Sequence, residues 1–246
     1  MKLISIVFAA LALLGSVSAV AGDYVIHAGR LIDGNSSKAM EQMSVLVKDQ
    51  QIVGIEKGYV AATDGQEVID LKNHTLMPGL MDMHTHLDIN PNPAEALTDA
   101  FLRDEADRAL RATDYVEDVL MAGFTTVRNL GGITTLNLRD AVNAGYIPGP
   151  RIYAAGTAIA TTGGHADQTN GLNRTLSHLM GPPGPTEGVV NGPYEARQAV
   201  RQRYKDGSDV IKLTVTGGVG SLARSGDNTQ FMADELEAIM QAANDY

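Results

Sequence analysis

The feature that most constrains the fold is a change of rhythm at Gly79, after which strand-like apolar stretches alternate with amphipathic helical stretches. Strands are predicted over residues 80–88, 124–132, 151–160 and 208–218. Helices are predicted over residues 95–121 and 193–206, and a further helix begins at residue 233. Such alternation is typical of parallel strands joined by crossover helices, so the sequence predicts an α/β fold.

The number of these units indicates part of a larger architecture. The four βα units after Gly79 end inside an apparent helix, whereas a complete (β/α)8 barrel has eight units and needs about 250 residues. We therefore expect residues 79–246 to form the first half of a (β/α)8 TIM barrel. A complete open α/β sheet is the alternative, because four strands can also form one.

The segment before the barrel portion has a different pattern. Residues 22–78 contain short alternating stretches separated by turn residues, over residues 24–33, 43–49, 50–58 and 67–79. This pattern predicts a small β layer.

The first residues resemble an export signal. Met1 and Lys2 give a positive start, residues 3–14 are almost wholly apolar, and small residues follow up to Ala21. We expect a signal peptide over residues 1–21 and an exported protein, periplasmic or secreted. A membrane anchor is the alternative, but the apolar run is shorter than the roughly 20 residues that span a bilayer.

Charge and cysteine content exclude some classes of function and of stabilising bond. The chain carries a formal charge of −10, which would repel a phosphate backbone and makes nucleic acid an unsuitable partner. It has no cysteine, so packing or bound metal must stabilise it without disulfides.

Two histidines in the stretch "MPGLMDMHTHLD" form a candidate metal site. Residues i and i+2 of a strand point to the same side, so His84 and His86 share a face. Two neutral imidazoles at the end of a barrel strand can hold a divalent cation. Two surface histidines are the alternative, but the Pro78-Gly79 corner, the apolar lead-in and Asp88 favour the metal.

Lys212 is the second candidate, in the stretch "DVIKLTVTGG". An unpaired ammonium inside an apolar strand is costly, and burial makes the neutral amine more available as a nucleophile. A neutral amine can add carbon dioxide and become a carbamate, whose two oxygens can each bind a metal. The alternatives are a lysine paired with a carboxylate and one that extends to the strand end.

Six segments together resemble the amidohydrolase superfamily, and within it the imidazolonepropionase-like branch that includes metal-dependent Xaa-Pro dipeptidases, or prolidases. They are "GRLIDG", "MPGLMDMHTHL", "AGFTTVRNLGG", "TTGGHAD", "DVIKLTVTGG" and "SGDNTQF". The resemblance implies a TIM barrel flanked by a β-sandwich, to which residues 22–78 would contribute. It also implies two divalent ions, Zn²⁺ or similar, with His84 and His86 as first-strand ligands and Lys212 as the carboxylated bridging lysine. Imidazolonepropionase itself uses one metal and lacks this lysine, so Lys212 favours the dipeptidase-like side.

The resemblance also implies an activity and its missing parts. The parent enzyme would hydrolyse C–N bonds of small amides or dipeptides through a metal-activated hydroxide, and His165 and Arg224 would contact the substrate. The family's two further histidine ligands and its acid/base aspartate would lie beyond Tyr246, so we expect this chain alone to be inactive.

Several alternatives stay open at the level of sequence. His165 is equally compatible with a loop histidine bonded to backbone, and Arg224 with a solvated loop charge. The alternative function is a non-catalytic exported binding module built on the barrel half. The exact substrate and the oligomeric state are not specified by these motifs.

Overall fold

The computed structural model describes residues 22–218 and 226–246, and the chain divides into two compact units. The first unit ends at Pro78, and the second begins at Gly79 and continues to Tyr246. The predicted signal peptide over residues 1–21 therefore lies outside the described residues.

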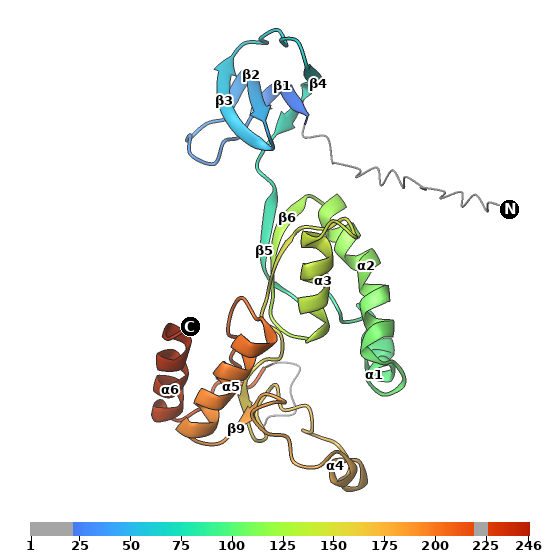
Figure 1. Cartoon of the computed structure of the whole chain (residues 1–246), viewed down its shortest axis with the longest axis vertical. Coiled ribbons are helices and arrows are strands. Elements are labelled where there is room, and N and C mark those ends of the chain that lie inside the picture. The colour runs from blue at the N-terminus through green and yellow to red at the C-terminus, as the bar shows by residue number, and fades with distance from the viewer. Residues whose placement is uncertain (1–21, 219–225) are drawn as a thin grey trace, which may run out of the picture. The chain divides into compact units, whose positions relative to one another are not determined.

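The first unit contains a four-stranded sheet (Figure 1). Its strands are β1 Asp23–Leu31, β2 Met40–Lys48, β3 Gln51–Lys57 and β4 Gln66–Leu76. The order is β3-β2-β1-β4, in which β1 and β4 are parallel and the other pairs antiparallel. The prediction of a small β layer is confirmed.

Local backbone chemistry shapes this sheet. Asp49 and Gln50 join β2 to β3 with φ of 48° and 65°, the left-handed conformations that a tight two-residue hairpin needs. The register of β1 against β4 shifts between Ala28 and Arg30. Gly29 lies at this shift, where a Cβ atom would collide with the carbonyl oxygen of Lys72, so the close approach of the two strands requires glycine.

The second unit contains strands and helices in alternation. They are β5 Leu80–Thr85, α1 Pro93–Leu102, α2 Glu105–Met121, β6 Phe124–Asn129, α3 Thr134–Asn143, β7 Arg151–Ala154, β8 Ala160–Thr161, α4 Arg174–Met180, β9 Val189–Val190, α5 Pro193–Asp206 and α6 Ala233–Asn244. The predicted α/β class is confirmed, and the helix predicted over residues 193–206 has the bounds of α5.

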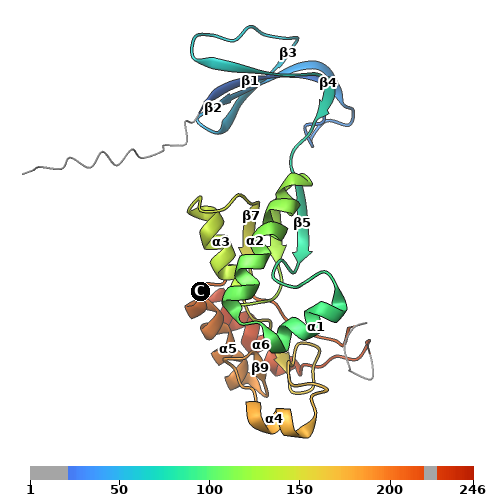
Figure 2. The same ribbon diagram turned by 90° about the vertical axis from the view of Figure 1, so that its right-hand side faces the viewer.

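A parallel sheet with the order β5-β6-β7 forms the first part of this unit. Helices α2 and α3 pack against β6 and β7 (Figure 2). The buried side chains between them are small or branched and apolar, among them Ala112, Val116, Val127 and Ile152. Strands β5 and β6 are paired in parallel, so their carboxyl ends lie at one edge of the sheet.

The two later strand predictions need correction. The strand predicted over residues 151–160 divides into β7 and β8, because Gly156 between them has φ of 63° and interrupts the extended chain. Residues 208–218 form only isolated bridges, Leu213 with Ile159 in parallel and Thr216 with Thr229. Their backbone still lies beside residues 154–160, since the Ile159 N–H donates to the Lys212 carbonyl at 2.8 Å.

The single helix predicted over residues 95–121 is also wrong, because two helices occupy this segment. Helix α1 begins after Asn92, whose side chain accepts from the Ala94 N–H. Helix α2 begins after Asp104, whose carboxylate accepts from the Asp107 N–H at 3.0 Å. An N-capping side chain inside the predicted segment thus starts a new helix.

A second core lies under α5 and α6, which pack side by side (Figure 1). Buried Glu235 in the first turn of α6 joins the two helix starts, because its carboxylate accepts from the N–H groups of Gly192 and Met232 at 2.5 and 2.7 Å. Each of these is a charge-assisted bond to an otherwise unpaired helix-terminal N–H. The carboxylate therefore fixes α6 to the first turn of α5.

Buried Arg203 of α5 fixes the long Pro/Gly-rich loop before β9. Its guanidinium donates to the carbonyls of Thr157 and Thr186 at 3.1 and 2.6 Å. Burial lowers the pKa of Arg203, and the charges of Asp206 and Glu187 oppose that shift. The middle of this loop is thereby bonded to the chain between β7 and β8.

Within residues 22–218 and 226–246, no helix is both long and apolar enough to cross a membrane.

Candidate metal and substrate site

The two predicted metal-binding histidines lie together at the carboxyl end of β5. His84 belongs to the strand and His86 follows its last residue, and their ring centroids are 5.3 Å apart. The His84 N–H donates to the Asp82 carboxylate at 2.9 Å, and the Ile89 N–H to the His86 carbonyl at 3.3 Å. The chain therefore turns directly after His86 and leaves both rings at the strand end.

Three other predicted residues lie close enough to His86 for their charges to act on its imidazole. Desolvation lowers the pKa of the His86 imidazole, although the residue stays open to solvent. The positive charges of His84, Lys212 and His165 lower the same pKa further, in that order. The structure thus brings together four residues from three separate segments of the chain, and these charges favour the neutral imidazole that binds metal.

Lys212 reaches this group from the segment beside β7 and β8. It is half-buried, and its backbone carbonyl accepts from the Ile159 N–H. The segment continues to Gly218, where a Cβ atom would lie 2.7 Å from Cε1 of His165. The chain that carries Lys212 therefore passes directly against the His165 ring.

His165 is held by a residue that the sequence analysis did not single out. Its backbone N–H donates to the side-chain oxygen of Gln230 at 3.0 Å, and the Gln230 N–H donates to the carbonyl of Val215 at 2.7 Å. Gln230 thus joins the His165 loop to the Lys212 segment. Its place in the quoted stretch "SGDNTQF" is the signal that could have identified it.

Two further residues named in the sequence analysis are Arg224 and Asp88. Arg224 lies outside the described residues. Asp88 is 8% exposed, and burial raises its pKa while the charge of Arg108 opposes the rise. Its carboxylate packs against Gly132, which has φ of 84° and no room for a Cβ atom.

The donor set is therefore two imidazoles and an amine. In the part of the chain that the structure describes, no three residues among His, Cys, Asp and Glu are grouped to hold a metal ion. Lys212, whose charge acts on His86, adds an amine to these two imidazoles.

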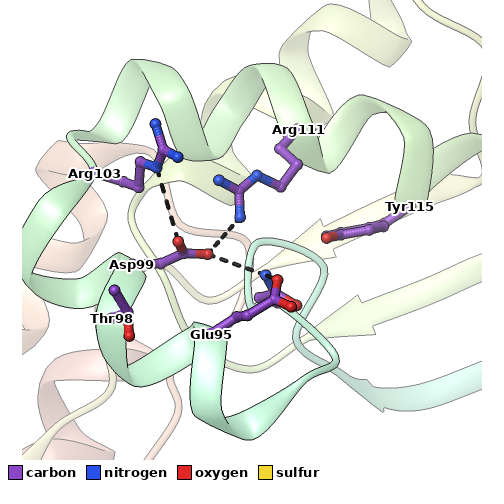
Figure 3. A pocket seen from close by; sticks show the side chains of 7 residues that line it. Glu95, Thr98, Asp99, Arg103, Arg111 and Tyr115 are labelled. Atoms are coloured by element: carbon purple, nitrogen blue, oxygen red, sulfur yellow. Dashed lines mark hydrogen bonds and ion pairs between the residues drawn. The ribbon is translucent and has the colours of Figure 1, made fainter.

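A polar cavity of about 420 Å³ opens between α1, α2 and the loop after β5 (Figure 3). Its centre is Asp99, whose side chain is 15% exposed and accepts from Arg111 at 2.5 Å and from Asn90 at 3.2 Å. Arg103 lies 3.9 Å from the other carboxylate oxygen. Asp99 of α1 is thus paired with Arg103 and with Arg111 of α2. We therefore interpret the residues that line this cavity as a structural contact between α1 and α2.

This contact predicts a pH dependence of stability. The hydrogen bond from Asn90 lowers the pKa of Asp99 below its ordinary value of 3.8; burial opposes this shift, and Arg111 and Arg103 add to it. The ionised carboxylate therefore stabilises the folded chain above that value, and its contribution is lost as the pH falls through the lower folded pKa. We expect Asp99→Asn to lower the free energy of unfolding near neutral pH, and the difference from wild type to shrink below pH 3.8.

Urea unfolding followed by circular dichroism at stepped pH measures this difference. Asp114→Asn is the matched control, because it replaces an exposed carboxylate of α2 by the same amide. A constant difference between Asp99→Asn and wild type at all pH values would contradict the assignment.

Comparison with known proteins identifies the family of this chain. The sequence profile of the Amidohydrolase family matches residues 75–246. An ochratoxinase from Aspergillus niger is 29% identical over 233 residues, which cover 89% of this chain and 47% of the relative. The chain therefore spans about half the length of the curated relatives that it matches most fully.

Solved structures give the same result. A Xaa-Pro dipeptidase crystallised with methionine in its active site is 47% identical, with a TM-score of 0.84, over 92% of this chain and 55% of the other. A prolidase complexed with N-methylphosphonate-L-proline is 30% identical, with a TM-score of 0.75, over 91% of this chain and 54% of the other. With its match over most of its length, the chain belongs to the amidohydrolase family.

Proposed function

We propose that the whole protein containing this chain is a metal-dependent hydrolase of amide C–N bonds, with Xaa-Pro dipeptides as its substrate class. Family membership supports the reaction type, and the likeness to a Xaa-Pro dipeptidase and a prolidase supports the substrate class. The observation that carries the proposal is the convergence of His84, Lys212 and His165 on His86.

The residues present fit a divalent metal such as Zn²⁺. Imidazole nitrogens are preferred zinc ligands, and two of them lie at one strand end. Lys212 becomes an anionic ligand when its neutral amine attacks carbon dioxide: an N–C bond forms, and a proton leaves to solvent. A carbamate has two oxygens, each of which could hold a metal ion. When bound, such ions make a water nucleophilic near neutral pH and polarise the substrate carbonyl.

The chain's own residues would then divide the remaining work. His84, His86 and Lys212 hold the ions, and His165 contacts the substrate carbonyl or carboxylate from its place beside Gly218. Arg224, outside the described residues, is proposed to pair with a substrate carboxylate through its forked donors.

The finer architecture is part of the same proposal. The parallel order β5-β6-β7, with the Lys212 segment beside residues 154–160, supports residues 79–246 as the first half of a (β/α)8 barrel. Residues 22–78 would be part of a β-sandwich, and residues 1–21 a signal peptide for export. Because this chain offers three ligands of a larger set, we expect residues 22–246 alone to bind metal weakly and to hydrolyse little.

A hydrolysis assay with controlled metal content tests the proposal. The full-length protein is stripped with a chelator and reloaded with Zn²⁺ or Co²⁺, and release of free proline from Xaa-Pro dipeptides is measured. We expect release only after reloading, and little from the reversed Pro-Xaa dipeptides. Metal and dipeptide binding without any release would overturn the proposal and favour the non-catalytic binding module.

A further inference from the structure

Asn129 is a fully buried polar residue at the end of β6. It is the register partner of Thr85, the last residue of β5, so it lies beside the strand end that carries His84 and His86. The proposed metal chemistry does not use it. A buried amide is retained only where its hydrogen bonds are made, which directs attention to its partners.

The amide oxygen of Asn129 holds the chain on both sides of His86. It accepts from the backbone N–H of Leu87 at 2.7 Å and from the hydroxyl of Thr85 at 3.3 Å. In addition, the N–H of Leu130 donates to the carbonyl of Thr85 at 3.0 Å. The residues before and after His86 are thus bonded to one buried side chain.

The amide nitrogen of Asn129 holds the surface on which the His86 ring lies. It donates to the carbonyl of Gly131 at 2.5 Å. A Cβ atom at Gly131 would lie 3.2 Å from Nδ1 of His86, so the imidazole packs directly on this glycine. The Leu87 N–H can only donate and the Gly131 carbonyl can only accept. These two partners therefore fix which end of the Asn129 amide is the oxygen and which is the nitrogen.

From these contacts we infer that Asn129 is a positioning residue for the metal-binding imidazole of His86, acting through Thr85, Leu87 and Gly131 without touching the substrate. This inference rests on the proposed function for its metal-binding consequence. Metal ligands must be held to within a few tenths of an ångström, so loosening the turn around His86 weakens binding even when the ring itself is present.

Two variants separate the contacts. Asn129→Ala removes all of them, whereas Asn129→Asp keeps an acceptor for Leu87 and loses the donor to Gly131. In the full-length protein, we expect the Co²⁺ dissociation constant to rise roughly 10- to 100-fold in Asn129→Ala, as for other residues that orient metal ligands. Asn129→Asp should give a smaller rise. The visible absorption of bound Co²⁺ should change in both variants, since it reports ligand geometry.

Arg203→Met is the control, because it also removes buried polar contacts, but these are made with Thr157 and Thr186. It should lower the melting temperature and leave Co²⁺ affinity and absorption unchanged. Imidazole ¹⁵N signals, assigned to His86 with a His86→Gln variant, give a second readout that needs no metal. We expect Asn129→Ala to shift and broaden them.

The outcomes distinguish the inference from the proposed function. Unchanged Co²⁺ affinity and unchanged His86 signals in a folded Asn129→Ala protein would overturn the inference. A wild-type protein that binds no Co²⁺, while Asn129→Ala still shifts the His86 signals, would overturn the proposed function and leave the positioning role supported. If Asn129→Ala does not fold, the same readouts in Asn129→Asp decide, and wild-type values there would overturn the inference.

Discussion

The variant His86→Ala is expected to lose nearly all Xaa-Pro hydrolysis in the full-length protein, with a fall in kcat/KM of about 10³-fold or more. His86 is the residue on which His84, Lys212 and His165 converge, so its loss removes a ligand from the centre of the proposed site. Metal ions contribute several kcal/mol to transition-state stabilisation in such hydrolases, and each 1.4 kcal/mol is about tenfold in rate. Metal content, measured by atomic absorption, should fall together with activity.

His178→Ala is the matched control, because His178 is an exposed histidine near the end of α4. It should leave metal content and hydrolysis at wild-type values, and circular dichroism should show both variants folded. A folded His86→Ala protein with wild-type metal content and activity would show that β5 does not carry the metal site.

Elements with a single strong local signal were predictable from the sequence. Helix α5 has Pro193 in its first turn and Gly207 after its end, and the structure places Gly207 at φ of 88° as the helix cap. Predictions failed where a capping residue or a glycine interrupts a longer pattern. Asp104 divides the predicted helix because its carboxylate competes for a backbone N–H, and Gly156 divides the predicted third strand.

The burial of α6 shows a finer limit of pattern analysis. The apolar spacing of the sequence predicts a buried face with Leu236, Ile239, Met240 and Ala243. All of these except Met240 do pack in the core, whereas Met240 is 57% exposed and Ala238 is buried in addition. Packing against α5 favours small side chains at the contact, because small residues allow close approach of the two helices. Hydrophobicity alone cannot distinguish an alanine that lies in a contact from one that does not.

The site could be predicted in part for a similar reason. His84 and His86 are two positions apart at the end of one predicted strand, so strand periodicity alone predicts that they lie together. Lys212 and His165 join them through pairing of distant segments, which periodicity does not specify. Asn129 and Gln230 act through backbone groups of other residues, and only coordinates show which N–H or carbonyl they reach.

The second large effect is expected for Lys212. Lys212→Ala should lower kcat/KM for Xaa-Pro dipeptides by about 10³-fold, because the proposed carbamate would supply a negative charge and two metal-binding oxygens that alanine lacks. Lys212→Arg should be equally inactive, since its guanidinium keeps the positive charge but remains protonated and cannot add carbon dioxide. Lys205→Ala on the exposed surface of α5 should behave as wild type.

Further experiments test directly whether Lys212 carries a carbamate. Wild-type protein reloaded with metal in buffer free of carbon dioxide should regain activity slowly, and bicarbonate should restore the normal rate. Labelling with ¹³C-bicarbonate should give a carbamate carbonyl signal that is absent from Lys212→Arg. A short carboxylic acid should partly restore Lys212→Ala, because it places two oxygens in the space left by the side chain. Full activity of Lys212→Arg would mean that the residue acts only as a cation, and the assignment of Lys212 as a metal ligand would then be wrong.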